Sequence, residues 1–181
     1  RVVLSDLTMT DGDIRDIGRI CIVACGSSYH VGMVGKYTLE RLLRRPVEVS
    51  LASEFRYSDP LVGEGDLVIV ISQSGETLDT MAALREAKKR GARVLGIVNV
   101  VGSSIARESD DVLYTWAGPE IAVATTKAYS TQMVVLHLLG LYFGDVMGTV
   151  DLETYSAMVR GIEALPGQME QVLEHTEDIR A

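Results

Sequence analysis

Short runs of Val, Ile and Leu alternate along the chain with longer amphipathic stretches, and this pattern predicts its secondary structure. Five apolar runs have the length of strands, at residues 19–24, 47–51, 67–71, 93–98 and 112–116. Helical spacing is found at 29–43, 78–90 and 104–108, and a long, largely apolar helix is expected at 125–143. Gly91 follows the second of these helices, where a left-handed C-cap is typical.

These elements predict a three-layer α/β/α fold. Strands that are nearly continuous Val/Ile runs, separated by helices, are typical of a parallel sheet with right-handed crossovers and helices on both faces. We therefore expect five parallel strands in the flavodoxin-like order 2-1-3-4-5.

The two ends of the chain are expected to lie outside the α/β domain. Residues 1–18 are polar and predict an irregular lead-in with a turn at Asp11-Gly12-Asp13, and residues 19–145 predict the α/β domain itself. Residues 146–181 predict a helical connector interrupted at Leu165-Pro166-Gly167. Because the chain opens on Arg1 without a leader, we expect it to be a piece of a longer protein.

Charge and composition exclude several classes of partner. The chain has 17 basic and 25 acidic residues, for a net charge of −8, which argues against nonspecific binding to nucleic acid or anionic lipid. No apolar stretch reaches the roughly 18 residues that a membrane span needs. Cys21 and Cys25 are expected to be free thiols, which suits a cytoplasmic location. No motif for a metal or a cofactor is found, so none is expected.

Two Ser-rich loops carry the candidate chemistry, because each lies between a predicted strand and the next helix. They are Gly26-Ser27-Ser28, after the first strand, and Ser72-Gln73-Ser74-Gly75-Glu76-Thr77, after the third. In a 2-1-3-4-5 sheet, ligands bind beyond the carboxyl ends of strands 1 and 3, where the strand order reverses. Each helix N-terminus adds unpaired backbone N–H groups and a partial positive charge. The loops together predict a site for a phosphate monoester.

Neither loop contains Lys or Arg, so the anion is expected to be held by neutral donors. These are the Gln73 amide and the hydroxyls of Ser28, Ser72, Ser74 and Thr77. A plainer interpretation is that the hydroxyls are ordinary helix N-caps, and a flavodoxin-like FMN site also stays open. Dinucleotide and P-loop motifs are absent, since Tyr37 follows Gly35-Lys36.

Five segments match the pattern of a known family. They are Cys25 to His30, Ala52 to Tyr57, Ser72 to Thr80, Asn99 with Gly102 to Ser104, and Gly118 to Tyr129. Together they resemble the sugar isomerase (SIS) domain and, more narrowly, the isomerase half of glutamine–fructose-6-phosphate aminotransferases. Small departures exist: Ser27 and Thr125 stand where Thr and Ser are more usual, and Ala122 where Gly is common.

The resemblance implies roles for nine residues. It implies that Ser28, Ser72, Gln73, Ser74 and Thr77 bind the phosphate of a hexose 6-phosphate, with Gly26 and Ser27 beside it. Val123 and Thr125 would line the sugar. The ligand implied is fructose 6-phosphate or its aminated product.

The resemblance also implies what this chain lacks. The family enzymes join a glutaminase domain to two SIS subdomains, and this chain resembles only the first subdomain. The imine lysine, the carboxylate base and the ring-opening group come from the second subdomain, the C-terminal tail and a neighbouring subunit. We therefore expect a homodimer that binds the sugar phosphate without catalysing the reaction alone, and assign no catalytic residue. A phosphosugar-sensing regulatory domain, or another SIS isomerase or deglycase, stays open as an alternative.

Several other polar residues invite a functional interpretation. Lys127 is expected to pair with a carboxylate at a helix start, while the roles of Glu120, Glu54 and Arg56 are left open between site, subunit contact and solvated ion pair. His137 is expected to be a satisfied core histidine and Cys25 to serve in packing. His30 is left open between approach to a ligand and an ordinary, partly buried place, and His175 lies in the connector.

Overall fold

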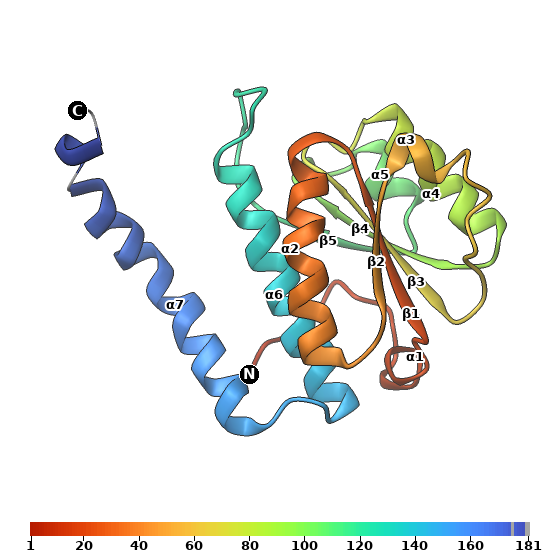
Figure 1. The fold of residues 1–181 in the computed structure, drawn as a ribbon, viewed down its shortest axis with the longest axis horizontal. Coiled ribbons are helices and arrows are strands. Elements are labelled where there is room, and N and C mark those ends of the chain that lie inside the picture. Colours follow the sequence, from red (N-terminus) through yellow and green to blue (C-terminus); the bar gives the residue numbers. More distant parts are fainter. Residues whose placement is uncertain (175, 180–181) are drawn as a thin grey trace.

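Five parallel strands form one sheet at the centre of the computed structural model, which describes residues 1–174 and 176–179 (Figure 1). The strands are β1 (Arg19–Ala24), β2 (Val47–Leu51), β3 (Asp66–Ser72), β4 (Arg93–Val98) and β5 (Asp111–Tyr114). They lie in the order β2-β1-β3-β4-β5, and every neighbouring pair is parallel. The predicted strand order is therefore confirmed, and with it the reversal between β1 and β3.

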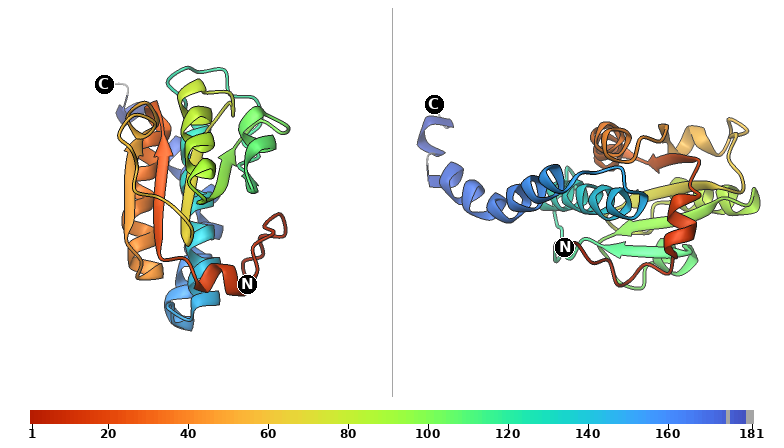
Figure 2. Two further views of the ribbon diagram at one scale, coloured as in Figure 1. Left: turned by 90° about the vertical axis from the view of Figure 1, so that its right-hand side faces the viewer. Right: turned by 90° about the horizontal axis from the view of Figure 1, so that it is seen from below.

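Helices cover both faces of the sheet (Figure 2). One face carries α1 (Asp11–Arg15), α2 (Gly26–Leu43) and α6 (Lys127–Met147), and the other carries α3 (Ala52–Phe55), α4 (Leu78–Lys89) and α5 (Ser104–Glu108). The chain continues in α7 (Leu152–Glu174) and a short 3-10 helix at Thr176–Ile179. This arrangement confirms the three-layer α/β/α fold.

Successive side chains of a strand point to opposite faces of the sheet, so the hydrophobic core has two parts, one on each face. In β1, Ile20 and Ile22 pack with the α2 and α6 side chains, whereas Cys21 and Val23 pack with those of α3 and α4. All four side chains are almost completely buried. Cys21 is a free thiol whose burial raises its pKa to about 12, so it stays protonated at neutral pH.

The structure corrects the prediction at both ends of the chain. Residues 11–15 form a helix where a turn was predicted, because Thr10 and Asp13 make a capping box: the Asp13 N–H donates to Thr10 Oγ1 at 3.2 Å, and the Thr10 N–H donates to Asp13 Oδ2 at 2.7 Å. At the other end α7 continues through Pro166, so the predicted interruption at 165–167 is wrong.

The α7 helix extends away from the sheet (Figure 1), and none of its side chains is buried. In the described part of the chain, no helix is both long and apolar enough to cross a bilayer. His175 lies outside the described residues.

Candidate functional site

The two Ser-rich loops meet at the carboxyl edge of the sheet, beside the ends of β1 and β3. They enclose a hollow of about 410 Å³ together with the segment from Glu120 to Thr125, which follows β5. All nine residues singled out from the sequence line it: Gly26, Ser27, Ser28, Ser72, Gln73, Ser74, Thr77, Val123 and Thr125. The fold thus brings together three segments that are about 50 residues apart in the chain.

The first loop places the start of α2 at the hollow. Cys25 is the N-cap residue, and its side chain makes no capping bond. Gly26 begins the helix with φ +55°, a left-handed value that favours glycine. The N–H groups of Gly26, Ser27 and Ser28 belong to the first turn and have no intrahelical acceptor. The helix dipole therefore points its positive end at the hollow.

The second loop is a tight turn held by its own hydroxyls. The Gly75 N–H donates to Ser72 Oγ at 3.0 Å, and the Glu76 N–H donates to Ser74 Oγ at 3.2 Å. Ser72 Oγ also lies 3.0 Å from Thr77 Oγ1. Ser74 accepts a hydrogen bond in the turn, so its own proton can be donated to a ligand.

The hydroxyls of these loops do not cap helices, which removes the plainer interpretation. Thr77 is the N-cap residue of α4, but its side chain makes no capping bond and its hydroxyl lies against Ser72 instead. The first-turn amides of α4 therefore add to those of α2 as groups that can face an anion.

The segment after β5 is held by Glu120. One carboxylate oxygen accepts from the Thr126 N–H and the Thr125 hydroxyl, both at 3.1 Å, and from the Ala128 N–H at 3.3 Å. The other accepts from the Ala122 N–H at 3.3 Å. Hydrogen bonds, the Thr126 N–H first among them, lower the pKa of Glu120. A carboxylate that is so fully bonded is a weak base.

Charge in the hollow is unusual for an anion site. Its lining residues in the described chain include no Lys or Arg, and Glu120 is the one carboxylate among them. The polar groups of the lining are instead the N-terminus of α2, the hydroxyls of Ser28, Ser72, Ser74 and Thr77, and the Gln73 amide, which are the groups expected from the sequence.

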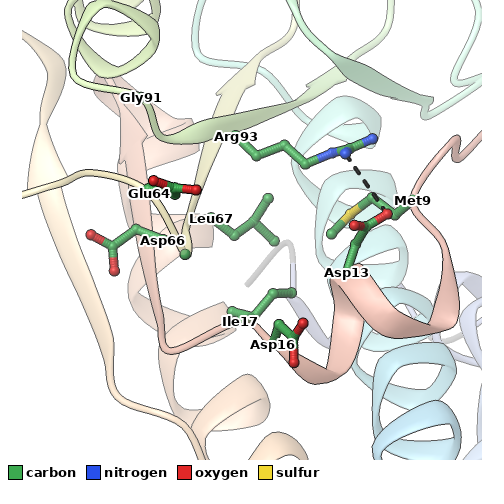
Figure 3. A pocket seen from close by; sticks show the side chains of 10 residues that line it. Met9, Asp13, Asp16, Ile17, Glu64, Asp66, Leu67, Gly91 and Arg93 are labelled. Carbon is green, nitrogen blue, oxygen red and sulfur yellow. Dashed lines mark ion pairs between the residues drawn. The ribbon is translucent and has the colours of Figure 1, made fainter.

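A second hollow, of about 330 Å³, lies at the opposite edge of the sheet, where β3 and β4 begin (Figure 3). Four carboxylates line it, those of Asp13, Asp16, Glu64 and Asp66, against the single cation Arg93. Arg93 is already paired with Asp13 at 4.0 Å, and with Asp111 at 2.7 Å. This acidic hollow repels a phosphate dianion, so the carboxyl edge is the better candidate.

Three other residues singled out from the sequence, His137, Cys25 and His30, have contacts within the protein. His137 lies with Nδ1 2.8 Å from the Met133 carbonyl oxygen and Nε2 3.4 Å from Thr38 Oγ1, which confirms a satisfied histidine. Cys25 lines the hollow and its sulfur accepts from the Thr80 hydroxyl at 3.9 Å. His30 is exposed and makes an edge contact with the ring of Tyr29.

Three charged residues near the hollow, Lys127, Arg56 and Glu54, are not among its lining residues. Lys127 is exposed at the start of α6, and the described chain offers it no ion pair, contrary to the expected pairing. Arg56 pairs with Asp79 at 3.4 Å and lies 4.4 Å from the centre of the Tyr57 ring. Glu54 is exposed on α3.

The sequence does not predict the roles of two residues beside the hollow. Glu120 stands out as a candidate, but its role in holding the segment depends on partners up to eight residues away and has no local signature. Gln132 has no signal in the sequence, because it follows two other polar residues of the same helix, Ser130 and Thr131. It is completely buried, and its Oε1 accepts from the Ser28 hydroxyl at 3.1 Å.

Comparison with known proteins identifies related sequences. The family model described as the SIS domain matches residues 13–142. The glutamine–fructose-6-phosphate aminotransferase (isomerizing) of Clostridium tetani is 54% identical over 176 residues, which is 97% of this chain and 29% of that protein. The enzyme of the same name from Symbiobacterium thermophilum is 55% identical over 172 residues, which is 95% of this chain and 28% of that protein. The chain therefore spans less than a third of these relatives.

Solved structures agree with the fold. The C-terminal domain of glucosamine-fructose-6-phosphate aminotransferase from Francisella tularensis superposes with a TM-score of 0.89 at 38% identity, covering 93% of this chain and 48% of that chain. A putative phosphosugar isomerase from Silicibacter pomeroyi DSS-3 superposes with a TM-score of 0.72 at 29% identity, covering 86% of this chain and 49% of that chain.

Proposed function

Because this chain belongs to the SIS domain family, we propose that it is the phosphosugar-binding unit of the isomerase part of a glutamine–fructose-6-phosphate aminotransferase. Such an enzyme makes glucosamine 6-phosphate from fructose 6-phosphate and ammonia derived from glutamine. The observation that carries the proposal is the hollow in which both Ser-rich loops and two helix N-termini converge.

In this proposal the loops hold the phosphate of a hexose 6-phosphate. The first-turn amides of α2 and α4 donate to the phosphate oxygens, and the hydroxyls of Ser28, Ser72, Ser74 and Thr77 add to them. Val123 and Thr125 contact the sugar from the segment that Glu120 holds. The phosphate is the handle by which this unit orients the substrate.

The proposal leaves the bond-making steps to other parts of the enzyme. Amination of a ketose needs a lysine for an imine and a base that moves a proton between C1 and C2. No lysine lines the hollow in the described chain, and Glu120 is a weak base because its oxygens are already bonded. The isolated chain should therefore bind fructose 6-phosphate, and show no turnover when ammonia is added.

The proposal extends to the organisation of the protein. We infer that residues 1–18 lead into a phosphosugar-binding domain at 19–145, and that 146–181 connect it to a second SIS unit. A glutaminase domain would complete the enzyme. We also infer a homodimer located in the cytoplasm.

The binding site is tested by replacing two hydroxyls with Ser72→Ala and Ser74→Ala together. Each lost hydrogen bond to a charged group is worth about 1.5–3 kcal/mol, so the affinity for fructose 6-phosphate should fall by at least about a hundredfold in titration calorimetry. A matched control replaces Ser5 and Ser156, which lie outside the hollow, and should leave affinity unchanged. Unchanged affinity in the folded Ser72/Ser74 variant would refute the site.

A comparison of ligands tests the substrate class. An enzyme unit should prefer fructose 6-phosphate and glucosamine 6-phosphate to N-acetylglucosamine 6-phosphate, and should bind fructose without phosphate far more weakly. A preference for the acetylated sugar would instead favour a sensor.

A further inference from the structure

The Gln132 side chain is buried beside the proposed phosphate site with half of its amide unpaired. Its Oε1 accepts from Ser28 Oγ at 3.1 Å, and Ser28 lines the hollow at the start of α2. Its Nε2 has no hydrogen-bond partner in the described part of the chain. Gln132 is 0% exposed, so its amide is out of contact with bulk solvent. Such orphaned buried donors are rare and call for a physical explanation.

Counting protons shows why this matters for Ser28. A serine hydroxyl has one proton, and here that proton is donated to Gln132, away from the hollow. A phosphate dianion only accepts hydrogen bonds. In this arrangement Ser28 therefore has no hydroxyl proton to offer to a phosphate, although it lies buried at the site.

A half-turn of the amide about its terminal bond reverses the situation. Nε2 then occupies the place of Oε1 and donates to Ser28 Oγ, and the serine proton is free to point into the hollow. Oε1 loses its partner in exchange, so each orientation leaves one amide atom unpaired. The structure has the first orientation, and a ligand that accepts from Ser28 favours the second one.

We propose that Gln132 is a positioning residue of the phosphate site, whose amide turns on ligand binding to form the chain Gln132 N–H, Ser28 O–H, phosphate oxygen. Donation to the serine oxygen strengthens the hydrogen bond that the serine then makes. This strengthening matters in a site whose lining has no Lys or Arg. The inference rests on the proposed function, because it needs a phosphate monoester in the hollow.

A double-mutant cycle in the full-length protein tests the proposal, with glucosamine 6-phosphate titrated by calorimetry. Gln132→Met removes donor and acceptor at similar volume, and should weaken binding about two- to fourfold, because Gln132 and Ser28 share one hydrogen bond in both states and only the strengthening of the Ser28–phosphate bond is lost. In a Ser28→Ala background the same change should have no further effect, because Gln132 acts through the Ser28 hydroxyl. Gln168→Met, on the exposed surface of α7, is the matched control and should bind normally.

The outcomes separate this inference from the function on which it rests. An equal loss of affinity in both backgrounds, or no loss in the folded Gln132→Met variant, overturns the role of Gln132 and leaves the phosphosugar site standing. Failure of the unaltered protein to bind any hexose phosphate overturns both.

A second measurement does not depend on how Gln132→Met folds. In protein labelled with 15N-glutamine, ligand binding should shift the side-chain NH2 resonances of Gln132, because a new hydrogen bond forms there. Gln132→Glu, which keeps the side-chain shape, identifies these resonances. Resonances that stay in place at saturating ligand would overturn the proposal.

Discussion

Three serine hydroxyls at the carboxyl edge have partners within the protein. Ser72 and Ser74 accept from the backbone of their own turn, and Ser28 is bonded to Gln132. The second loop is therefore shaped before a ligand arrives, and its donors need little reorganisation to meet a phosphate. Since the lining residues carry no cation, salt should weaken binding less than at a Lys- or Arg-based site.

Gly75 allows the second loop to exist in this form. Its φ is +67°, and an added Cβ would lie 2.0 Å from Ser103 Oγ. Gly75→Ala should lower the free energy of unfolding by about 2–4 kcal/mol, since strain in the left-handed region adds to overpacking. The measurement is urea unfolding.

Gly102→Ala is the control for the Gly75 variant. Gly102 has a similar φ of +70°, but an added Cβ would meet nothing within 4 Å. It should show only the smaller backbone cost. Equal destabilisation of the two variants would mean that Ser103 does not restrict the loop.

The residues of the two Ser-rich loops could be predicted from the sequence, because each loop is a short continuous motif that directly follows a predicted strand. The partners that hold them could not be predicted in the same way. Glu120 accepts from the Ala128 N–H in α6, and Gln132 meets Ser28 across 104 positions of chain. The contact between Gln132 and Ser28 arises only when α2 and α6 pack together, and the one between Glu120 and Ala128 depends on how the chain folds back onto the start of α6.

Among the elements, α6 has an unusual start. Its N-cap residue Thr126 makes no side-chain capping bond, and the carboxylate of Glu120 takes that role by accepting from the N–H groups of Thr126 and Ala128. A negative charge at a helix N-terminus is favourable, and this one also fixes the segment that lines the hollow from Glu120 to Thr125.

Acid should release this contact. The folded state lowers the pKa of Glu120, so its contribution to stability is complete above the ordinary glutamate value of 4.5 and is lost as the pH falls through the lower folded value. Glu120→Gln should therefore reduce the thermal midpoint at pH 7, and the difference from the unaltered protein should shrink steadily as the pH falls below 4.5. Glu163→Gln, on exposed α7, should leave the midpoint unchanged. A difference that does not shrink on acidification would contradict the assignment.

Elements with strong periodicity could be predicted, and short or isolated ones could not. The helix at 11–15 depends on the capping box and on burial of Ile14 rather than on its own periodicity. The four-residue helix α3 is held by burial of Ala52 and Phe55 beneath the sheet edge. Pro166 removes one N–H donor and its ring crowds the preceding turn, yet α7 continues past it.

On the scale of the whole molecule, the two edges of the sheet differ in charge. Four carboxylates gather around the hollow where β3 and β4 begin, while the opposite hollow is lined by neutral donors and one fully bonded carboxylate. The net charge of −8 thus leaves the carboxyl edge comparatively free of repulsion for an anionic ligand.

The place of α7 in the molecule is open to a direct test. None of its side chains is buried, and Leu173 is 68% exposed, so little apolar surface is lost from the core when the helix is removed. A chain ending at Asp151 should unfold cooperatively, with a thermal midpoint within about 5 °C of the longer chain, because each kcal/mol moves the midpoint by about 2–4 °C.

A second truncation provides the contrast. A chain ending at Gln132 loses Leu136, Leu139 and Phe143, which are completely buried against the sheet, and should fail to fold. If the chain ending at Asp151 also failed, α7 would belong to the core of this domain. If it folds, α7 is not part of this core, and its exposed apolar residues are free to contact another unit, as the proposed connector would require.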